Sequence, residues 1–92
     1  MSTYVMFGKY SLEGAKGISS KRTDQSMALL KKYNAELKAG YALLGSVDLL
    51  LIVESPDTGK AMQLSAALGK LLGVSFSTAP AVSIEEFDKL MS

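Results

Sequence analysis

The chain has 92 residues and a formal net charge of +1, and it contains neither cysteine nor histidine. This length indicates a single domain, residues 1–92. The missing cysteine and histidine exclude a disulfide framework, a thiolate nucleophile and an imidazole that could act as base or metal ligand. Without these residues we expect no metal and no cofactor. A nearly neutral chain also lacks the basic field that holds a phosphate backbone, so we expect no nucleic-acid partner.

Residues 3–10, TYVMFGKY, are rich in aromatic and β-branched side chains. Alternation places Val5 and Phe7 on one face and Tyr4 and Met6 on the other, so the pattern predicts a strand that is covered on both sides. Residues 11–20 contain glycines and serines and predict a loop, which leads to a helix N-cap at Ser19 or Ser20.

Apolar residues at three- and four-residue steps predict an amphipathic helix from Lys21 to about Tyr33. Ser26 is the one polar member of its apolar stripe. Asn34 can adopt the left-handed conformation that commonly ends a helix. Residues 37–44, LKAGYALL, then predict a weaker strand of the kind found at a sheet edge.

Gly45-Ser46 is typical of a two-residue type II′ turn, in which case Leu44 and Val47 close a hairpin. The strand that follows has an entirely apolar face at 47, 49, 51 and 53. Its other face, at 48, 50, 52 and 54, is apolar in the middle and acidic at both ends. We expect the first face to pack on helices and the second to meet another subunit.

A second helix is predicted to begin after Asp57 as N-cap and to end at Gly73, with an apolar stripe at 61, 64, 68 and 71. Its small residues 65–67 and 69 allow close approach of another element. Residues 74–80 predict a last edge strand that ends at Pro80. Ser83 begins a capping box for a short terminal helix.

The element order β-α-β-β-α-β predicts an α+β, ferredoxin-like fold with an antiparallel sheet in the order 4-1-3-2, followed by a short C-terminal helix. In this topology the first and third strands are central. They are also the two strands with apolar residues on both faces, whereas glycine, serine or proline weakens the other pair.

Hydrophobic residues make up 48% of the chain without glycine, and a domain this small cannot bury them all. We therefore expect a homodimer or higher oligomer, joined through the sheet face that bears Met6, Leu50 and Ile52. The longest apolar run, residues 49–53, is far shorter than the roughly 18 residues of a spanning helix. No leader pattern is present, so we expect a cytoplasmic protein with no membrane partner.

The segments TYVMFGKY, GSVDLLLIVESPD and SIEEFDKL resemble the GYD domain family of small bacterial and archaeal proteins over nearly the whole chain. The family's Gly-x-Tyr/Val-Asp step stands here as Gly45, Ser46, Val47 and Asp48, with valine where tyrosine is usual. The resemblance implies a ferredoxin-like fold of the dimeric α/β-barrel type, in which two sheets face each other. It implies no particular activity.

Antiparallel neighbours bring the end of the first strand beside the start of the third, so a ligand cleft is predicted from Lys9, Tyr10, Tyr41 and Asp48. The simpler alternative, which we favour, is a cross-strand ion pair between Lys9 and Asp48. Neither reading assigns a catalytic residue.

A second candidate site is an anion site at the start of the first helix, formed by Ser19, Ser20 and Arg22. Helix N-termini present free amide groups to anions. The spacing matches neither a P-loop nor a dinucleotide-binding fingerprint, and a capped, flexible loop is the favoured alternative.

Two function classes follow. We favour a small oligomeric module that binds a compact ligand or only other proteins. The alternative is a cofactor-independent enzyme, of the monooxygenase or isomerase type, that works through Asp48, Lys9 or a tyrosine. It ranks second because histidine, the usual proton-transfer residue, is absent.

Overall fold

The computed structural model describes residues 1–92, which form four strands and four helices. In chain order these are β1 (Ser2–Tyr10), α1 (Leu12–Lys16), α2 (Ser20–Lys32), β2 (Glu36–Ala42), β3 (Leu49–Ser55), α3 (Thr58–Leu72), β4 (Val74–Ala81) and α4 (Ile84–Met91). None of the helices is both long and apolar enough to cross a membrane.

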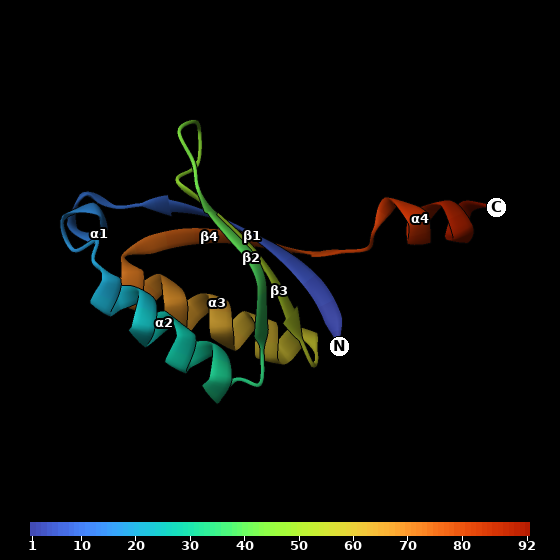
Figure 1. Cartoon of the computed structure of the whole chain (residues 1–92), viewed down its shortest axis with the longest axis horizontal. Helices are drawn as coiled ribbons and strands as arrows, with labels where there is room; N and C mark the ends of the chain where they lie inside the picture. Colours follow the sequence, from blue (N-terminus) through green and yellow to red (C-terminus); the bar gives the residue numbers. More distant parts are fainter.

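The strands form one antiparallel sheet in the order β2-β3-β1-β4. Helices α2 and α3 lie side by side against one face of this sheet, and the opposite face carries no helix (Figure 1). The predicted α+β, ferredoxin-like architecture and strand order are confirmed, with β1 and β3 in the centre. We call the uncovered side the open face.

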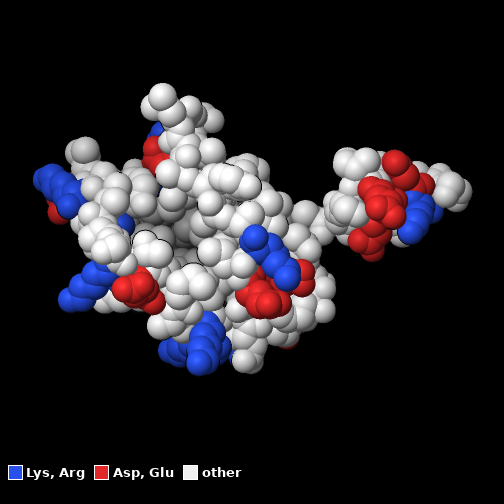
Figure 2. All heavy atoms as spheres, viewed as in Figure 1, with Lys and Arg blue, Asp and Glu red and all other residues white.

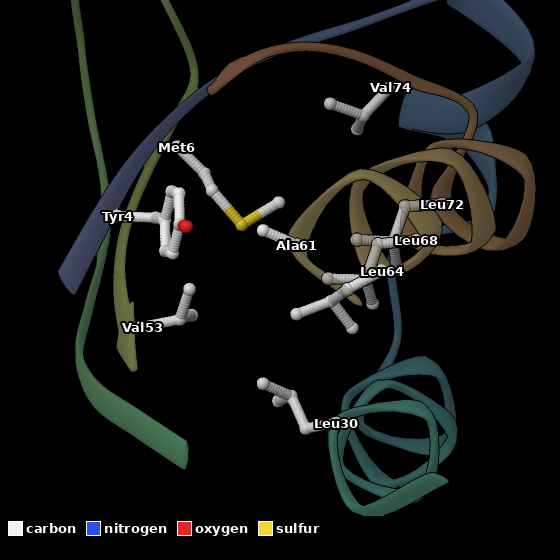
Figure 3. Close-up of a cluster of buried hydrophobic side chains, with 9 residues drawn as sticks. All are labelled: Tyr4, Met6, Leu30, Val53, Ala61, Leu64, Leu68, Leu72 and Val74. Atoms are coloured by element: carbon white, nitrogen blue, oxygen red, sulfur yellow. The ribbon is translucent and has the colours of Figure 1, made fainter. Parts of the chain in front are cut away.

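The core lies between α3 and the two central strands (Figure 3). Tyr4 and Met6 of β1 and Val53 of β3 point toward α3, and Leu30 reaches the same cluster from α2. The pattern predicted for α3 is confirmed except at its end, where Leu72 rather than Leu71 is buried. The core residues are Tyr4, Met6, Leu30, Val53, Ala61, Leu64, Leu68, Leu72 and Val74.

The predicted helix boundaries are confirmed by their capping geometry. Ser19, Asp57 and Ser83 are the N-caps of α2, α3 and α4, and each side chain accepts a hydrogen bond from a backbone amide of the first turn. Asn34, just after α2, has a φ of 57°, and Gly73, which caps α3, has a φ of 65°. Both chain reversals therefore use the left-handed conformation.

The segment predicted as a loop, residues 11–20, contains the short helix α1. Ser11 caps it, and its hydroxyl donates a 3.0 Å hydrogen bond to the carbonyl oxygen of Gly73. Gly14 is buried against the end of α3, where a Cβ atom would collide with the carbonyl oxygens of Leu72 and Gly73. The sequence pattern missed α1 because this helix is held by tertiary contact rather than by an apolar stripe.

The predicted two-residue turn at Gly45-Ser46 is wrong. A type II′ turn needs a positive φ at its first central residue, and Gly45 does not have one. Instead the amide of Leu43 donates to the carbonyl of Asp48 at 2.8 Å, so four residues form a wider loop. Leu44 at its tip is fully exposed, and the loop projects beyond the sheet (Figure 1).

The register of the strands corrects one residue of the predicted interface. Val5 pairs with Ile52 and Phe7 with Leu50, so these four side chains share the open face. Met6 pairs with Leu51 and is completely buried on the helix side. The error arose because alternation gives each strand two faces, but only the register decides which faces lie on the same side.

We expect Gly14→Ala to lower the free energy of unfolding by about 1–3 kcal/mol, because the added methyl group meets backbone oxygens that cannot move aside easily. Gly45→Ala is the matched control: no atom lies within 4 Å of the position of its Cβ. The control should be neutral or stabilise the protein by up to about 1 kcal/mol. Urea unfolding of both variants measures the difference, and equal midpoints would contradict the packing of α1.

Candidate functional site

A cavity of about 160 Å³ lies between α2 and the sheet. Figure 2 shows the molecule hollowed between the helices and the sheet on this side. Nine of the 13 residues that line the cavity are hydrophobic. The lining is Tyr10, Ile18, Ser19, Arg22, Thr23, Ser26, Met27, Leu30, Leu37, Leu49, Leu51, Leu68 and Leu72.

The polar residues of this cavity all belong to the cap and the first two turns of α2. Ser19, Thr23 and Ser26 lie on the face of α2 that turns toward the sheet, in its cap and first two turns. Farther along, the same face continues with the apolar Met27 and Leu30. A molecule in the cavity would therefore meet an apolar interior and a polar end.

Arg22 is fixed at the polar end of the cavity. Its Nη1 donates to the carbonyl oxygen of Gly14 at 2.8 Å, and its Nη2 donates to that of Leu72 at 2.6 Å. The guanidinium carbon lies 5.9 Å from the centre of the Tyr10 ring, within range of a cation–π interaction. Its Nε is buried without a partner. One side chain thus ties α2 to the C-terminal ends of α1 and α3.

Asp48, just before β3, forms hydrogen bonds with β1 and with the residue that follows β2. Its Oδ2 accepts a 2.8 Å hydrogen bond from the Tyr10 amide, and its own amide donates to the carbonyl of Gly8 at 2.8 Å. Its carbonyl accepts from Leu43, beyond the end of β2. The half-buried carboxylate therefore satisfies a backbone donor where the ladder between β1 and β3 ends.

The predicted ion pair between Lys9 and Asp48 is not formed. Lys9 instead donates from Nζ to the carbonyl of Ser46 at 3.3 Å. Asp48 satisfies the Tyr10 amide, which would otherwise lack an acceptor at the end of its strand, through a short charge-assisted hydrogen bond. The exposed ammonium group of Lys9 needs no such partner, because water already hydrates it.

Residues 4–91 match the model of the GYD domain family. The chain belongs to this family. No curated protein sequence matches this GYD domain.

Solved structures with the same fold are similar to this GYD domain at low sequence identity. FFRP-DM1 has a TM-score of 0.63 at 20% identity, over 89% of this chain and 100% of the other. The leucine response regulatory protein LrpA of Mycobacterium tuberculosis scores 0.59 at 11% identity, over 89% of this chain and 51% of its own. Hypothetical protein PHS023 of Pyrococcus horikoshii scores 0.57 at 21% identity, over 90% and 92%. These likenesses show the fold alone.

The GYD domain does not gather all four predicted cleft residues around the cavity. Tyr10 lines the cavity, and Asp48 touches it only indirectly, by holding the Tyr10 amide. Lys9 lies on the open face near Asp48, and Tyr41 is 57% exposed on that face opposite Leu50. The sequence signal that could have located the cavity is Ser26, the polar gap in the apolar stripe of α2.

The residues of the predicted anion site lie together at the start of α2, but two of them have other partners. The Ser19 hydroxyl accepts a 3.4 Å bond from the Arg22 amide, and the Arg22 guanidinium donates to two carbonyls. Ser20 is exposed in the first turn. Anion binding at this helix end stays a prediction.

We expect Asp48→Ala to cost about 1–3 kcal/mol, because it leaves the half-buried Tyr10 amide without an acceptor. Asp48→Asn keeps an oxygen at this position and should cost about 1 kcal/mol or less. Asp24→Ala, a change of an exposed aspartate on α2 without an ion pair, serves as control and should stay within about 0.5 kcal/mol. Urea denaturation ranks the three variants, and an unchanged stability of Asp48→Ala would show that the hydrogen bond between Asp48 and the Tyr10 amide contributes nothing.

Proposed function

We propose that this GYD domain protein is a homo-oligomeric module that binds a compact, mainly apolar molecule in the cavity between α2 and the sheet. The observation that carries the proposal is the cavity itself, with its apolar interior and one polar end at Arg22 and Tyr10. A cytoplasmic location stays a prediction.

The volume of the cavity limits the size of the ligand. A dry cavity of about 150 Å³ with an aliphatic and aromatic lining accommodates benzene, and the present cavity measures about 160 Å³. One aromatic ring or one branched aliphatic chain would therefore fill it. Larger cofactors, including dinucleotides, exceed this space.

The polar end of the cavity favours a ligand that carries an oxygen acceptor. Arg22 is the only charged residue of the lining, and it is a cation. Tyr10 contacts the rest of the chain through its backbone amide and its ring, which leaves its hydroxyl available to a ligand. A small aromatic or branched-chain carboxylate meets both conditions.

The likeness to the leucine response regulatory protein LrpA does not define the ligand. At 11% identity it carries the fold alone, so the ligand class proposed here rests on the residues that line the cavity.

Catalysis without a cofactor is the second candidate function. Of the residues considered for proton transfer, only Tyr10 lines the cavity, while Asp48 is engaged by a backbone amide and Lys9 by a carbonyl. A reaction would therefore depend on the phenol of Tyr10. We rank binding first, since the chain supplies no second proton-transfer group at the cavity.

Self-association is the other part of the proposal. Val5, Phe7, Leu50 and Ile52 form an apolar centre on the open face, and no element of the chain covers it. Phe7 is 41% exposed at this centre. Two copies that face each other through this surface would remove both apolar centres from water.

Benzoate and 3-methylbutanoate at ten times Kd should raise the melting temperature by roughly 6–11 °C, since binding to the native state adds about 1.4 kcal/mol in a domain of this size. Acetate, which lacks an apolar body, should have no effect. Thermal unfolding measures the shift.

Ser26→Leu should abolish this shift, because the larger side chain fills the cavity. Gln25→Leu, an exposed neighbour outside the cavity, should keep it. A full ligand shift in Ser26→Leu would place the ligand elsewhere and refute the cavity as the site.

The protein should have the mass of a dimer or higher oligomer by light scattering at micromolar concentration. Leu50→Asp should reduce it to a monomer, because it places a charge at the centre of the apolar surface. Gln25→Asp, on the outer side of α2, should leave the mass unchanged. Circular dichroism confirms that both variants fold, and a monomeric wild type would contradict self-association.

A further inference from the structure

The C-terminal helix α4 has an apolar side that nothing in its own chain covers. Ile84, Phe87 and Met91 follow the spacing i, i+3, i+7, and Leu90 lies beside them. None of the residues of α4 is buried, and the helix stands apart from the rest of the molecule (Figure 1). Isolated helices of eight residues are marginal in water, so α4 depends on a partner surface.

The direction of the chain keeps α4 away from its own body. β4 ends at Ala81, and the exposed Val82 and the extended Ser83 continue outward to the first residue of α4. In Figure 2 the helix is joined to the remainder by a narrow connection. A helix carried on such an arm is suited to reach a second molecule.

A groove of about 630 Å³ runs between α3 and β4, on the side of the sheet that α2 and α3 cover. It extends along α3 from Thr58 to Lys70, which is about 18 Å, and α4 is about 12 Å long. Its helical wall is low because Ala61, Ser65 and Gly69 are small. The groove is thus long enough for α4, and its low wall permits a close approach.

Charge also matches α4 to this groove. Lys70 is the only charged residue of the groove. The polar side of α4 carries Glu85, Glu86 and Asp88 against the single Lys89, and acidic residues are prominent on the visible side of the helix (Figure 2). A helix with apolar anchors at i, i+3 and i+7 and an acidic flank complements a groove whose lining is half hydrophobic and whose one charged residue is basic.

We propose that α4 of each copy packs in the α3–β4 groove of a second copy, so that two chains exchange their C-terminal arms. This inference rests on the self-association proposed above and adds a contact separate from the open face. A reciprocal exchange of this kind closes under two-fold symmetry, because each copy offers one arm and one groove.

Disulfide trapping tests the exchange cleanly because the chain has no cysteine of its own. An equimolar mixture of Met62→Cys, at the groove, and Phe87→Cys, on the apolar side of α4, is oxidised at micromolar concentration. We expect the mixed disulfide dimer to form several-fold more than with Gln63→Cys in place of Met62→Cys. Residue 63 is the matched control, since it points about 100° away around the same helix.

Three results would overturn the inference. A mixed dimer no more abundant than the control would show that α4 does not reach the groove. A disulfide within one chain in the doubly substituted Met62→Cys, Phe87→Cys protein, at monomeric mass, would show that α4 folds back on its own groove. A higher yield for Phe7→Cys paired with Phe87→Cys would place α4 on the open face instead.

The disulfide-trapping test of the arm exchange can be distinguished from the test of the open-face interface. Trapping at control levels in a protein that is still a dimer refutes the arm exchange alone. Preferred trapping together with an unchanged mass for Leu50→Asp supports the arm exchange and shows that the arms hold two chains together without the open face.

Discussion

Two helices cover one face of a four-stranded sheet whose central strands are apolar on both faces, and the other features of the molecule follow from this constraint. The helix-covered face holds the single core. Only 12 of the 92 residues are buried, because the apolar side chains of the open face and of α4 lie outside that core. The proposed self-association would remove this remaining apolar surface from water.

Two charged side chains, Arg22 and Asp48, form hydrogen bonds with the backbone at the ends of helices and strands. Arg22 binds carbonyl groups where α1 and α3 end, and Asp48 binds an amide where β1 ends. Both residues hold Tyr10, one through its ring and the other through its amide. The polar end of the cavity is therefore rigid, which suits the binding of a ligand, while the charges that catalysis would need are already engaged.

The proposed ligand site and the surfaces proposed for association are in different places. The cavity lies between α2 and the sheet, the open face is on the opposite side of the sheet, and the α3–β4 groove is beside the other sheet edge. Leu51 and Leu49 of β3 line the cavity, while Leu50 of the same strand belongs to the open face. Alternate residues of one strand thus serve both roles, so binding and association need not compete.

The sequence alone determined the order of the strands and of the three longer helices, the central strands and the ends of these helices, because these depend on periodicity and on capping residues that act locally. Ser19, Asp57 and Gly73 each act within a turn of their own position. The tertiary structure decided which strand faces lie together, as Met6 shows, and where charged groups find partners, as Asp48 and Lys9 show. It also created the helix α1 and the cavity beside Ser26. These features depend on register and on contacts between residues far apart in the chain, which no local pattern specifies.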